Sequence, residues 1–272
     1  MAKPAINSML KQRIITALIL APLFLLIVIY GQNIGFAAMV LLIGAVAIFE
    51  WLKINQLPIA IVALNAVSIT LLCGYLMRWL PQPLEYYWLL SALIWLPALL
   101  WLKNHQWGYQ QKGLQIMIKT LYGVLAIMLF MLSMQQLHDH EMGVFRVLSL
   151  VFLIWVADIG AYFSGKNFGR HKLAVNISPG KTWEGVIGAQ LFVAIYAMIL
   201  AIVFQLSMFI LIPIMMVVAL FSVVGDLVAS LGKRQAKVKD SSQILPGHGG
   251  ILDRFDSMII AAPLYLILLD AL

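Results

Sequence analysis

The most polar stretch of the chain, residues 230–256, combines residue types that bind phosphates and metal ions. Its first part carries four basic side chains, Lys233, Arg234, Lys237 and Lys239. The sequence P-G-H-G-G follows at 246–250, and Asp253 and Asp256 come soon after it. Asp226 lies upstream, inside an apolar run. Cationic side chains, backbone N–H groups exposed by glycine, and carboxylates together suit a site for a metal ion and a nucleotide with its phosphates.

Helical spacing places several of these side chains on common faces. Asp226 and Ser230 are four residues apart and Lys233 is seven from Asp226, so all three share one face of a helix. Asp253 and Asp256 also share a face. We expect Asp226 and this pair to hold a hard divalent cation through oxygen, as Mg²⁺ prefers. The alternative for the pair is that two carboxylates at a helix N-terminus favour the helix dipole.

A second polar motif, S-P-G-K-T-W-E-G at 178–185, precedes a long apolar run. We expect Ser178 to be a helix N-cap and Pro179 the first helical residue. Free N–H groups at that helix start, with Lys181 and Thr182, would form an anion site. Residues just upstream add positive charge, namely Lys166, Arg170, His171 and Lys172. Lysines that fix membrane orientation are the alternative explanation, although they do not account for the order of the motif.

Carboxylates inside apolar runs are costly in a membrane and need a partner or a wet cavity. Asp158 and Asp226 lie late in such runs and near basic loops, which favours function over a structural contact between helices. Glu50, beside Trp51 at the end of another run, is either a functional carboxylate or an anchor at the membrane interface. The stretch 135–143 is interpreted as a solvated loop rather than a metal site, although it carries His138, Asp139, His140 and Glu141.

The elements that must position these residues are membrane-spanning helices. The 272 residues are 63% hydrophobic and 11% charged, whereas soluble domains carry roughly 25% charged residues. The apolar runs repeatedly supply the roughly 20 residues that one span needs. We therefore predict an integral membrane protein and attribute its net charge of +7 to topology and anionic lipid, not to nucleic acid. The one cysteine, Cys73, excludes an internal disulfide.

We predict an all-α, polytopic membrane helix bundle of about nine spans. These lie near 14–30, 34–52, 58–77, 86–102, 114–135, 145–163, 185–204, 208–230 and 256–271. About five form an N-terminal region, 1–140, and about four form a catalytic region, 141–272, with long loops at 164–184 and 231–255. The first run is interpreted as a retained helix because no small-residue cleavage site follows it.

Basic residues predict the orientation of the bundle. Of the 18 Lys and Arg residues, only Arg78 and Arg146 fall outside the segments on the N-terminal side. The positive-inside rule therefore predicts a cytoplasmic N-terminus and cytoplasmic catalytic loops, in the inner membrane of a bacterium. The apolar faces would permit a homodimer, on which the sequence is otherwise silent.

Residues 230–256 closely resemble the phosphatidate cytidylyltransferases, also called CDP-diacylglycerol synthases. The shared pattern is S-x-apolar-K-R-x4-K-D-x-small-x2-apolar-P-x-H-G-G-apolar-x-D-R-apolar-D, which Ser230 to Asp256 follow at many fixed positions. Asp158, the segments 161–163 and 168–169 and the 178–185 motif are also similar to the family, so the close resemblance covers about residues 150–257. The N-terminal half resembles the family only in hydropathy and in Glu50-Trp51. Two departures are Gly232, where the family usually has an apolar residue, and Ala229, where many members have glutamate.

The resemblance implies the transfer of a cytidylyl group from CTP to phosphatidate, with Mg²⁺ as the cofactor, and leaves a second cation open. The implied catalytic residues are Asp226, Lys233, Arg234, Lys239, Asp240, His248, Asp253 and Asp256. The implied substrate-binding residues are Asp158, Tyr162, Ser178, Lys181, Thr182, Glu184, Ser230, Gly249, Gly250 and Arg254. The metal ligands would be Asp226, Asp253 and Asp256, and the glycines would let backbone approach the nucleotide.

Two other functions compete with this reading. One is a CTP-dependent transferase acting on another membrane lipid phosphate, such as an isoprenoid phosphate or an ether lipid, because the apolar helices that would contact the lipid tail are degenerate. The other is an ion-coupled transporter that uses Asp158 and Asp226 as relay carboxylates. Polar residues biased to one side and the lack of a visible internal repeat disfavour the transporter.

Overall fold

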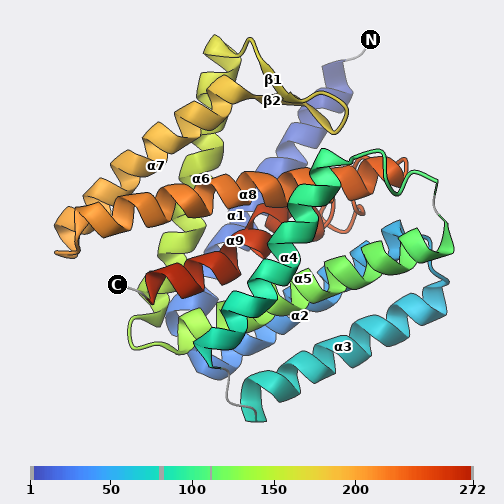
Figure 1. Cartoon of the computed structure of the whole chain (residues 1–272), viewed down its shortest axis with the longest axis horizontal. Coiled ribbons are helices and arrows are strands. Elements are labelled where there is room, and N and C mark those ends of the chain that lie inside the picture. Colours follow the sequence, from blue (N-terminus) through green and yellow to red (C-terminus); the bar gives the residue numbers. More distant parts are fainter. Residues whose placement is uncertain (1–2, 80–82, 111, 271–272) are drawn as a thin grey trace.

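The computed structural model describes residues 3–79, 83–110 and 112–270, and these residues form nine helices and one small sheet. The first five helices are α1 (Lys3–Tyr30), α2 (Gln32–Ile54), α3 (Ile59–Trp79), α4 (Leu84–Lys103) and α5 (Gly113–Asp139). The remaining elements are α6 (Gly143–Phe168), β1 (Lys172–Ala174), β2 (Ser178–Thr182), α7 (Trp183–Val203), α8 (Met208–Gln235) and α9 (Leu252–Leu269). Each predicted span corresponds to one helix, so the predicted helical bundle is confirmed (Figure 1).

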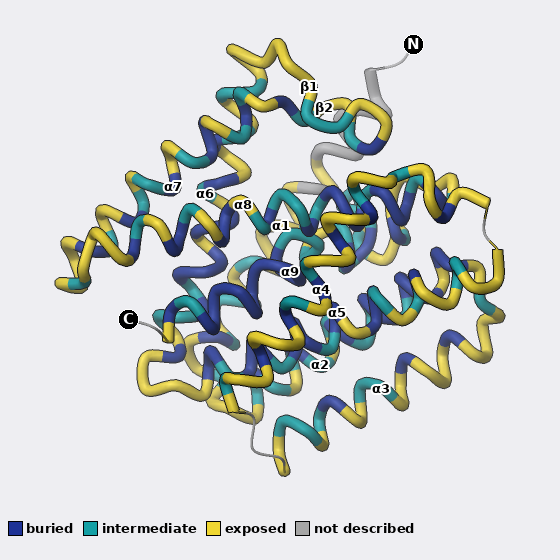
Figure 2. The backbone as a smooth tube through the Cα atoms, in the orientation of Figure 1, coloured by how far each residue is buried: buried dark blue, intermediate teal, exposed yellow. Residues whose placement is uncertain are grey.

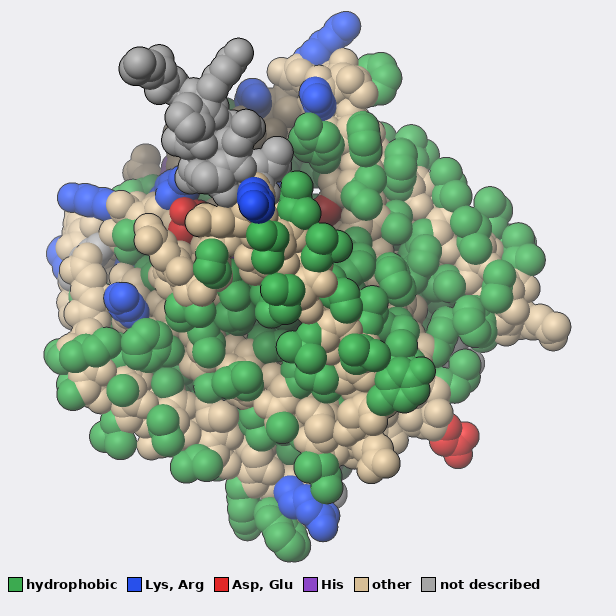
Figure 3. Space-filling view, turned by 180° about the vertical axis from the view of Figure 1, so that it is seen from behind, with side chains coloured by type: hydrophobic (Ala, Val, Ile, Leu, Met, Phe, Trp, Pro, Cys, Tyr) green, Lys and Arg blue, Asp and Glu red, His purple; other side chains and the backbone are tan. Residues whose placement is uncertain are grey.

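The outer surface of the bundle is apolar, as expected of an integral membrane protein. Seven helices, α2 to α8, are long and apolar enough to cross a membrane, and Ile14–Tyr30 of α1 is a shorter apolar stretch. Many large apolar side chains point outward, and Figure 3 shows them as a belt across the middle of the molecule. Most of the Lys and Arg side chains visible in Figure 3 lie in the upper half of that view. Because a soluble monomer rarely exposes so large an apolar surface, lipid must cover this belt.

Helix α9 forms the centre of the bundle. Its residues from Met258 to Ile267 are buried on all sides, as the dark tube in Figure 2 shows. It packs against α4, α5 and α8, so the predicted regions 1–140 and 141–272 share this helix as a common core. Three charged residues in its first turns, Asp253, Arg254 and Asp256, explain why α9 is not among the seven apolar spans. A helix that is apolar all round after such a start is suited to a protein core.

Glycines let the helices of the C-terminal half approach closely. A Cβ atom on Gly188 of α7 would collide with the Ser164 side chain of α6, and one on Gly160 of α6 would lie 2.9 Å from the Phe192 Cβ of α7. A Cβ on Gly225 of α8 would lie 2.6 Å from the backbone oxygen of Asp256 in α9. Such close packing of small residues is a common way to associate membrane helices. It brings α6, α8 and α9 near enough for their carboxylates to interact.

The expected helix start at Ser178 and Pro179 is wrong. Ser178–Thr182 is instead strand β2, paired antiparallel with β1 so that Lys172 faces Thr182 and Ala174 faces Ser178. Helix α7 begins only at Trp183, where the Thr182 side chain accepts a hydrogen bond from the Gly185 N–H at 3.1 Å. Thr182 is therefore the N-cap. The hairpin lies at one end of the bundle, beside the ends of α6 and α7 (Figure 1).

Several helices extend beyond their predicted bounds, and in α5 and α8 some of the added polar residues are buried by neighbours. Helix α8 continues to Gln235, so Lys233 and Arg234 belong to a helix and not to a loop. Helix α6 continues to Phe168. Helix α5 continues to Asp139, and the predicted loop position His138 is buried, with its ring stacked on Phe36 at 4.0 Å between centroids.

Candidate active site

A cavity of about 220 Å³ opens between α6, α7, α8 and strand β2. Its polar lining consists of Asp158, Tyr162, Lys181, Thr182, Ser222 and Ser257. Its remaining walls are small or apolar residues, mostly of α6, α7 and α8. Apolar walls with a few convergent polar groups are the usual form of a ligand site. This arrangement can receive a polar head group while apolar parts of the ligand remain against the helices.

Lys181 and Asp226 form the ion pair beside this cavity. The Lys181 Nζ lies 2.5 Å from Asp226 Oδ2, and both side chains are about one-quarter to one-third exposed. Ser230 donates from its Oγ to Asp226 Oδ1 at 3.2 Å, as the four-residue spacing predicted. Asp158 lies near enough to interact electrostatically with both Lys181 and Asp226. Groups from α6, β2 and α8 therefore meet at one place.

Lys233 forms a second, more buried ion pair. Its Nζ lies 2.6 Å from Asp253 Oδ1 and 3.9 Å from Asp256 Oδ2. The side chains of Lys233, Asp253 and Asp256 are only 9%, 6% and 12% exposed. A buried pair is costly to desolvate, and removing one partner leaves an uncompensated charge. This contact binds the C-terminal part of α8 to the first turn of α9.

The two ion pairs form one electrostatic cluster. Asp256 interacts with Asp226 and Lys181 as well as with Lys233. Four carboxylates and two ammonium groups thus gather at the ends of four elements, with an excess of negative charge. Hard carboxylate oxygens with excess negative charge suit a divalent cation. Mg²⁺ in particular is usually bound by one or two carboxylates together with phosphate oxygens of the substrate.

The three predicted metal ligands do not converge on one point. Within the described ranges, no group of three or more His, Cys, Asp or Glu side chains is placed to hold a metal ion. Asp253 is engaged with the protein, because its Oδ2 accepts from the Ser241 N–H at 2.8 Å and the Gly250 N–H at 2.9 Å. Asp226 and Asp256 are the two carboxylates of the trio that interact electrostatically with each other. The donor set therefore fits a cation shared with a phosphate ligand better than a cage made by the protein alone.

The segment between α8 and α9 folds as a compact loop around these carboxylates. The His248 N–H donates to the Leu245 oxygen at 2.9 Å, with Pro246 and Gly247 between them. Gly247 has a φ of +75°, so this is the arrangement of a type II turn. Gly249 also has a positive φ, of +83°, and a Cβ there would lie 2.8 Å from Asp253. Glycine is thus favoured at 247 by the backbone conformation, and at 249 by both the conformation and the close contact with Asp253.

Glu50 is a site residue that sequence reasoning left ambiguous. It is fully buried, and its two carboxylate oxygens accept from the Ser241 Oγ, Ser242 Oγ, Ile251 N–H and Leu252 N–H at 2.5–3.1 Å. It is therefore not an anchor at the membrane interface. In the sequence, only its position as a carboxylate at the end of the apolar run 34–52 indicated a role for Glu50. That position does not reveal partners about two hundred residues away in the chain.

Trp51 explains one of the two departures from the family pattern. Its indole N–H donates to the Lys119 oxygen at 3.0 Å, and its ring lies against Gly123 and Gly232. A Cβ on Gly232 would lie 2.8 Å from the ring, so an apolar side chain there would displace Trp51. Ala229, the other departure, lines a cavity of about 30 Å³ together with Trp51 and Asp256.

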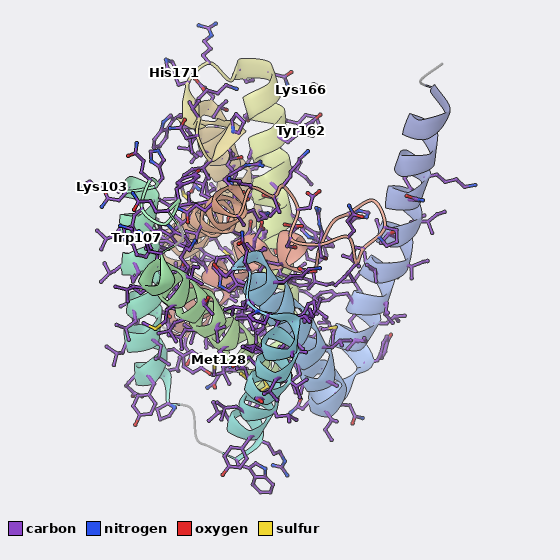
Figure 4. The ribbon with its side chains drawn as sticks, turned by 90° about the vertical axis from the view of Figure 1, so that its right-hand side faces the viewer. Lys103, Trp107, Met128, Tyr162, Lys166 and His171 are labelled. Carbon is purple, nitrogen blue, oxygen red and sulfur yellow. The ribbon has the colours of Figure 1, made fainter. Side chains whose placement is uncertain are left out.

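The other predicted site residues lie around this cluster. Arg234 donates from Nε to the Ile177 oxygen at 3.3 Å, which ties α8 to the β1–β2 turn. Glu184 accepts from the backbone and ring of His171, with 2.6 Å between Oε1 and Nδ1. Tyr162 and Lys166 lie one turn apart on α6, in contact at 3.5 Å, and both are labelled in Figure 4. His248 is half-buried, and Tyr162, Lys239, Asp240 and Arg254 are exposed.

Known proteins resemble this chain over nearly its whole length. A model of the cytidylyltransferase family matches residues 11–272. The phosphatidate cytidylyltransferase of Pseudomonas aeruginosa is 36% identical, over 97% of this chain and 98% of that protein. The phosphatidate cytidylyltransferase of Haemophilus influenzae is 34% identical, over 94% and 97%. That of Bacillus subtilis is also 34% identical, over 96% and 97%.

Proposed function

The chain belongs to the cytidylyltransferase family, and we propose from this premise that it transfers a cytidylyl group from CTP to phosphatidate, giving CDP-diacylglycerol and pyrophosphate. The observation that carries the proposal is the electrostatic cluster of the Lys181–Asp226 and Lys233–Asp253 pairs, in which Lys181 also lines the 220 Å³ cavity. Cationic groups and carboxylates at the edge of an apolar, lipid-exposed bundle suit a reaction between a nucleotide and a lipid phosphate.

The reaction requires two anions to approach each other. A phosphate oxygen of phosphatidate would attack the α-phosphorus of CTP, forming a new P–O bond. The bond from that phosphorus to the bridging oxygen of the β-phosphate would break, and pyrophosphate would leave. Because the attacking oxygen is already anionic, little proton abstraction is needed. Orientation of the two phosphates and stabilisation of the leaving charge are therefore the main contributions of the protein.

The basic side chains would supply that stabilisation. Lys181 lies at the cavity and would bind one phosphate, exchanging its contact with Asp226 for the substrate. Lys233 and Arg234 lie on the adjacent end of α8 and would face the triphosphate or pyrophosphate. Ammonium groups held at the point where negative charge develops stabilise the transition state without further reorganisation.

Mg²⁺ is part of the proposal as the cofactor. Asp226 and Asp256 would hold the ion together with phosphate oxygens of the nucleotide, and Asp253 would act through Lys233 instead. When bound, the ion neutralises phosphate charge and polarises the phosphoryl oxygens. The excess of carboxylates over ammonium groups in the cluster supports this assignment.

The basic residues also support a proposal for the location of the site. We propose that the site lies at the cytoplasmic face of a bacterial inner membrane. Lys103, Lys166 and His171 lie toward the same end of the bundle as the start of α1 (Figure 4), and the positive-inside rule assigns that end to the cytoplasm. CTP would enter from water there, while the lipid tails would stay between the helices and the bilayer.

The test is a lipid-substrate comparison with purified protein in detergent. Labelled CTP and Mg²⁺ are supplied with phosphatidate or with a polyprenyl phosphate, and labelled lipid and pyrophosphate are measured. We expect CDP-lipid and equimolar pyrophosphate with phosphatidate, and little product with the prenyl phosphate. Product from the prenyl phosphate alone would reassign the acceptor, and no CTP consumption with either lipid would overturn the transferase function.

A further inference from the structure

We propose that Glu50 is a positioning residue of this active site. Its buried carboxylate, presented by α2, would fix the loop that joins α8 to α9 and thereby hold Asp253 against Lys233. The inference rests on the proposed function for its activity readout only, because the loop contacts can be measured independently. It assigns a specific role to a residue of the N-terminal half, outside the motifs at 150–257.

The contacts of Glu50 occur in two matched sets. Oε1 accepts from the Ser242 Oγ at 2.5 Å and the Ile251 N–H at 3.1 Å. Oε2 accepts from the Ser241 Oγ and the Leu252 N–H, both at 2.8 Å. Because Leu252 is the first residue of α9, the carboxylate caps this helix from another element. A negative charge at a helix N-terminus is also favoured by the helix dipole.

Ser241 connects Glu50 to the ion pair. Its Oγ lies 2.8 Å from Glu50 Oε2 and 3.0 Å from Asp253 Oδ2, so the two carboxylates share one hydroxyl group. The Ser241 N–H also donates to Asp253 Oδ2 at 2.8 Å, while Asp253 Oδ1 binds Lys233. A movement of Glu50 would therefore be transmitted through Ser241 to Asp253 and then to Lys233.

The surroundings leave room for a carboxylate and little else. A Cβ on Gly250 would lie 2.5 and 2.6 Å from the two Glu50 oxygens, so backbone packs directly against them. Within the described part of the chain Glu50 forms no salt bridge, and the donors around it are hydroxyl and backbone N–H groups. A glutamine would present an NH₂ group to one backbone N–H, which cannot turn to accept.

Behind Glu50, Trp51 holds α2 in place. Its indole N–H donates to the Lys119 oxygen of α5, and its ring is enclosed between Gly123 and Gly232. The end of α2 is therefore a fixed support and not a mobile helix terminus. A carboxylate on a rigid support can hold a loop in the geometry that catalysis needs, and a misplacement of about 1 Å can lower the rate about 100-fold.

The test is Glu50→Gln in the full chain, with Glu85→Gln as the matched control at an exposed position on α4. Turnover of labelled CTP with phosphatidate and hydrogen exchange of the backbone are measured on each. For Glu50→Gln we expect kcat to fall by about 10- to 100-fold. Exchange at residues 241 and 250–252 should rise, while α2 and α5 keep their protection. Glu85→Gln should match the wild type in both measurements.

A second variant keeps the proposal testable if Glu50→Gln does not fold. Ser242→Ala removes one donor at 2.5 Å and leaves the carboxylate and its backbone partners. We expect a several-fold lower kcat and faster exchange at 250–252, with an unchanged melting temperature. Unchanged kcat in a folded Glu50→Gln or in Ser242→Ala would overturn the positioning role. If the wild type fails to turn over CTP, the proposed function fails, and unchanged exchange at 250–252 would separately refute the loop contact.

Discussion

At the scale of single residues, the site depends on buried ion pairs whose partners come from different helices. Lys233 contacts both Asp253 and Asp256. The exposed fractions of these three side chains are only 9%, 6% and 12%. The pair is therefore poorly screened by solvent, unlike a surface salt bridge. Its value is in the geometry that it enforces, because it fixes the end of α8 to the start of α9.

Lys233→Met should both inactivate and destabilise the protein. Removing the ammonium group leaves two neighbouring carboxylates buried without compensation, which is expected to cost about 3–5 kcal/mol in the free energy of unfolding. The melting temperature in detergent and the rate of CDP-lipid formation measure the two effects. Lys237→Met, at an exposed position just beyond α8, is the control and should change neither. Normal stability of Lys233→Met would show that the pair is not buried as described.

The roles of single residues could be predicted only where sequence spacing is local. Ser230 and Asp226 are one helical turn apart, and their hydrogen bond follows from that spacing. The partnerships of Lys181 with Asp226 and of Glu50 with Ser241 join distant segments, so no local pattern announces them. The proposed metal ligands illustrate the same limit, because spacing put Asp253 and Asp256 on one face without revealing that Asp253 binds the loop.

At the scale of elements, the closest packing surrounds Trp51. Gly232 of α8 and Gly123 of α5 both lie against its ring, and the site end of α8 is held by this contact. Gly232→Leu should therefore destabilise the protein by about 1–3 kcal/mol, because the added atoms would overpack the ring. Thermal unfolding in detergent measures the change.

The control for that substitution is Gly35→Leu on α2, where a Cβ would meet no atom within 4 Å. Replacing this glycine should leave stability unchanged or raise it by up to about 1 kcal/mol, since leucine is the better helix former. Equal melting temperatures of the two variants would contradict the packing of Trp51 against α8.

Helix positions were predictable because apolar runs of membrane length have few alternatives. Helix ends were not, because they depend on tertiary contacts. Lys233 and Gln235 look like loop residues, yet both are buried within α8. The S-P-G-K-T segment has the composition of a helix start, but pairing with Lys172–Ala174 draws it into a strand. That pairing moves the start of α7 to Trp183 and places Lys181 on the hairpin, above the carboxylates.

At the scale of the whole molecule, the bundle places polar chemistry at one end of an apolar body. Helix α9 is enclosed by α4, α5 and α8, and its charged first turn emerges beside the loop and the hairpin. At the other end Arg146 pairs with Asp270 at 2.7 Å, and Arg78 lies 5.0 Å from the Trp79 ring centroid. Arg78 and Arg146, the two basic residues predicted to lie on the opposite side of the membrane from the others, thus make contacts away from the site.

The measurement that tests the account most directly is the Mg²⁺- and CTP-dependent formation of CDP-lipid by purified Asp226→Asn. Asp270→Asn, which changes a carboxylate in the ion pair with Arg146, is the matched control. The account predicts that Asp226→Asn lowers the rate by about 100-fold or more, since it removes a charge that orders both Lys181 and the proposed ion. The melting temperature should stay close to that of the wild type. Near-normal turnover in Asp226→Asn would contradict the account.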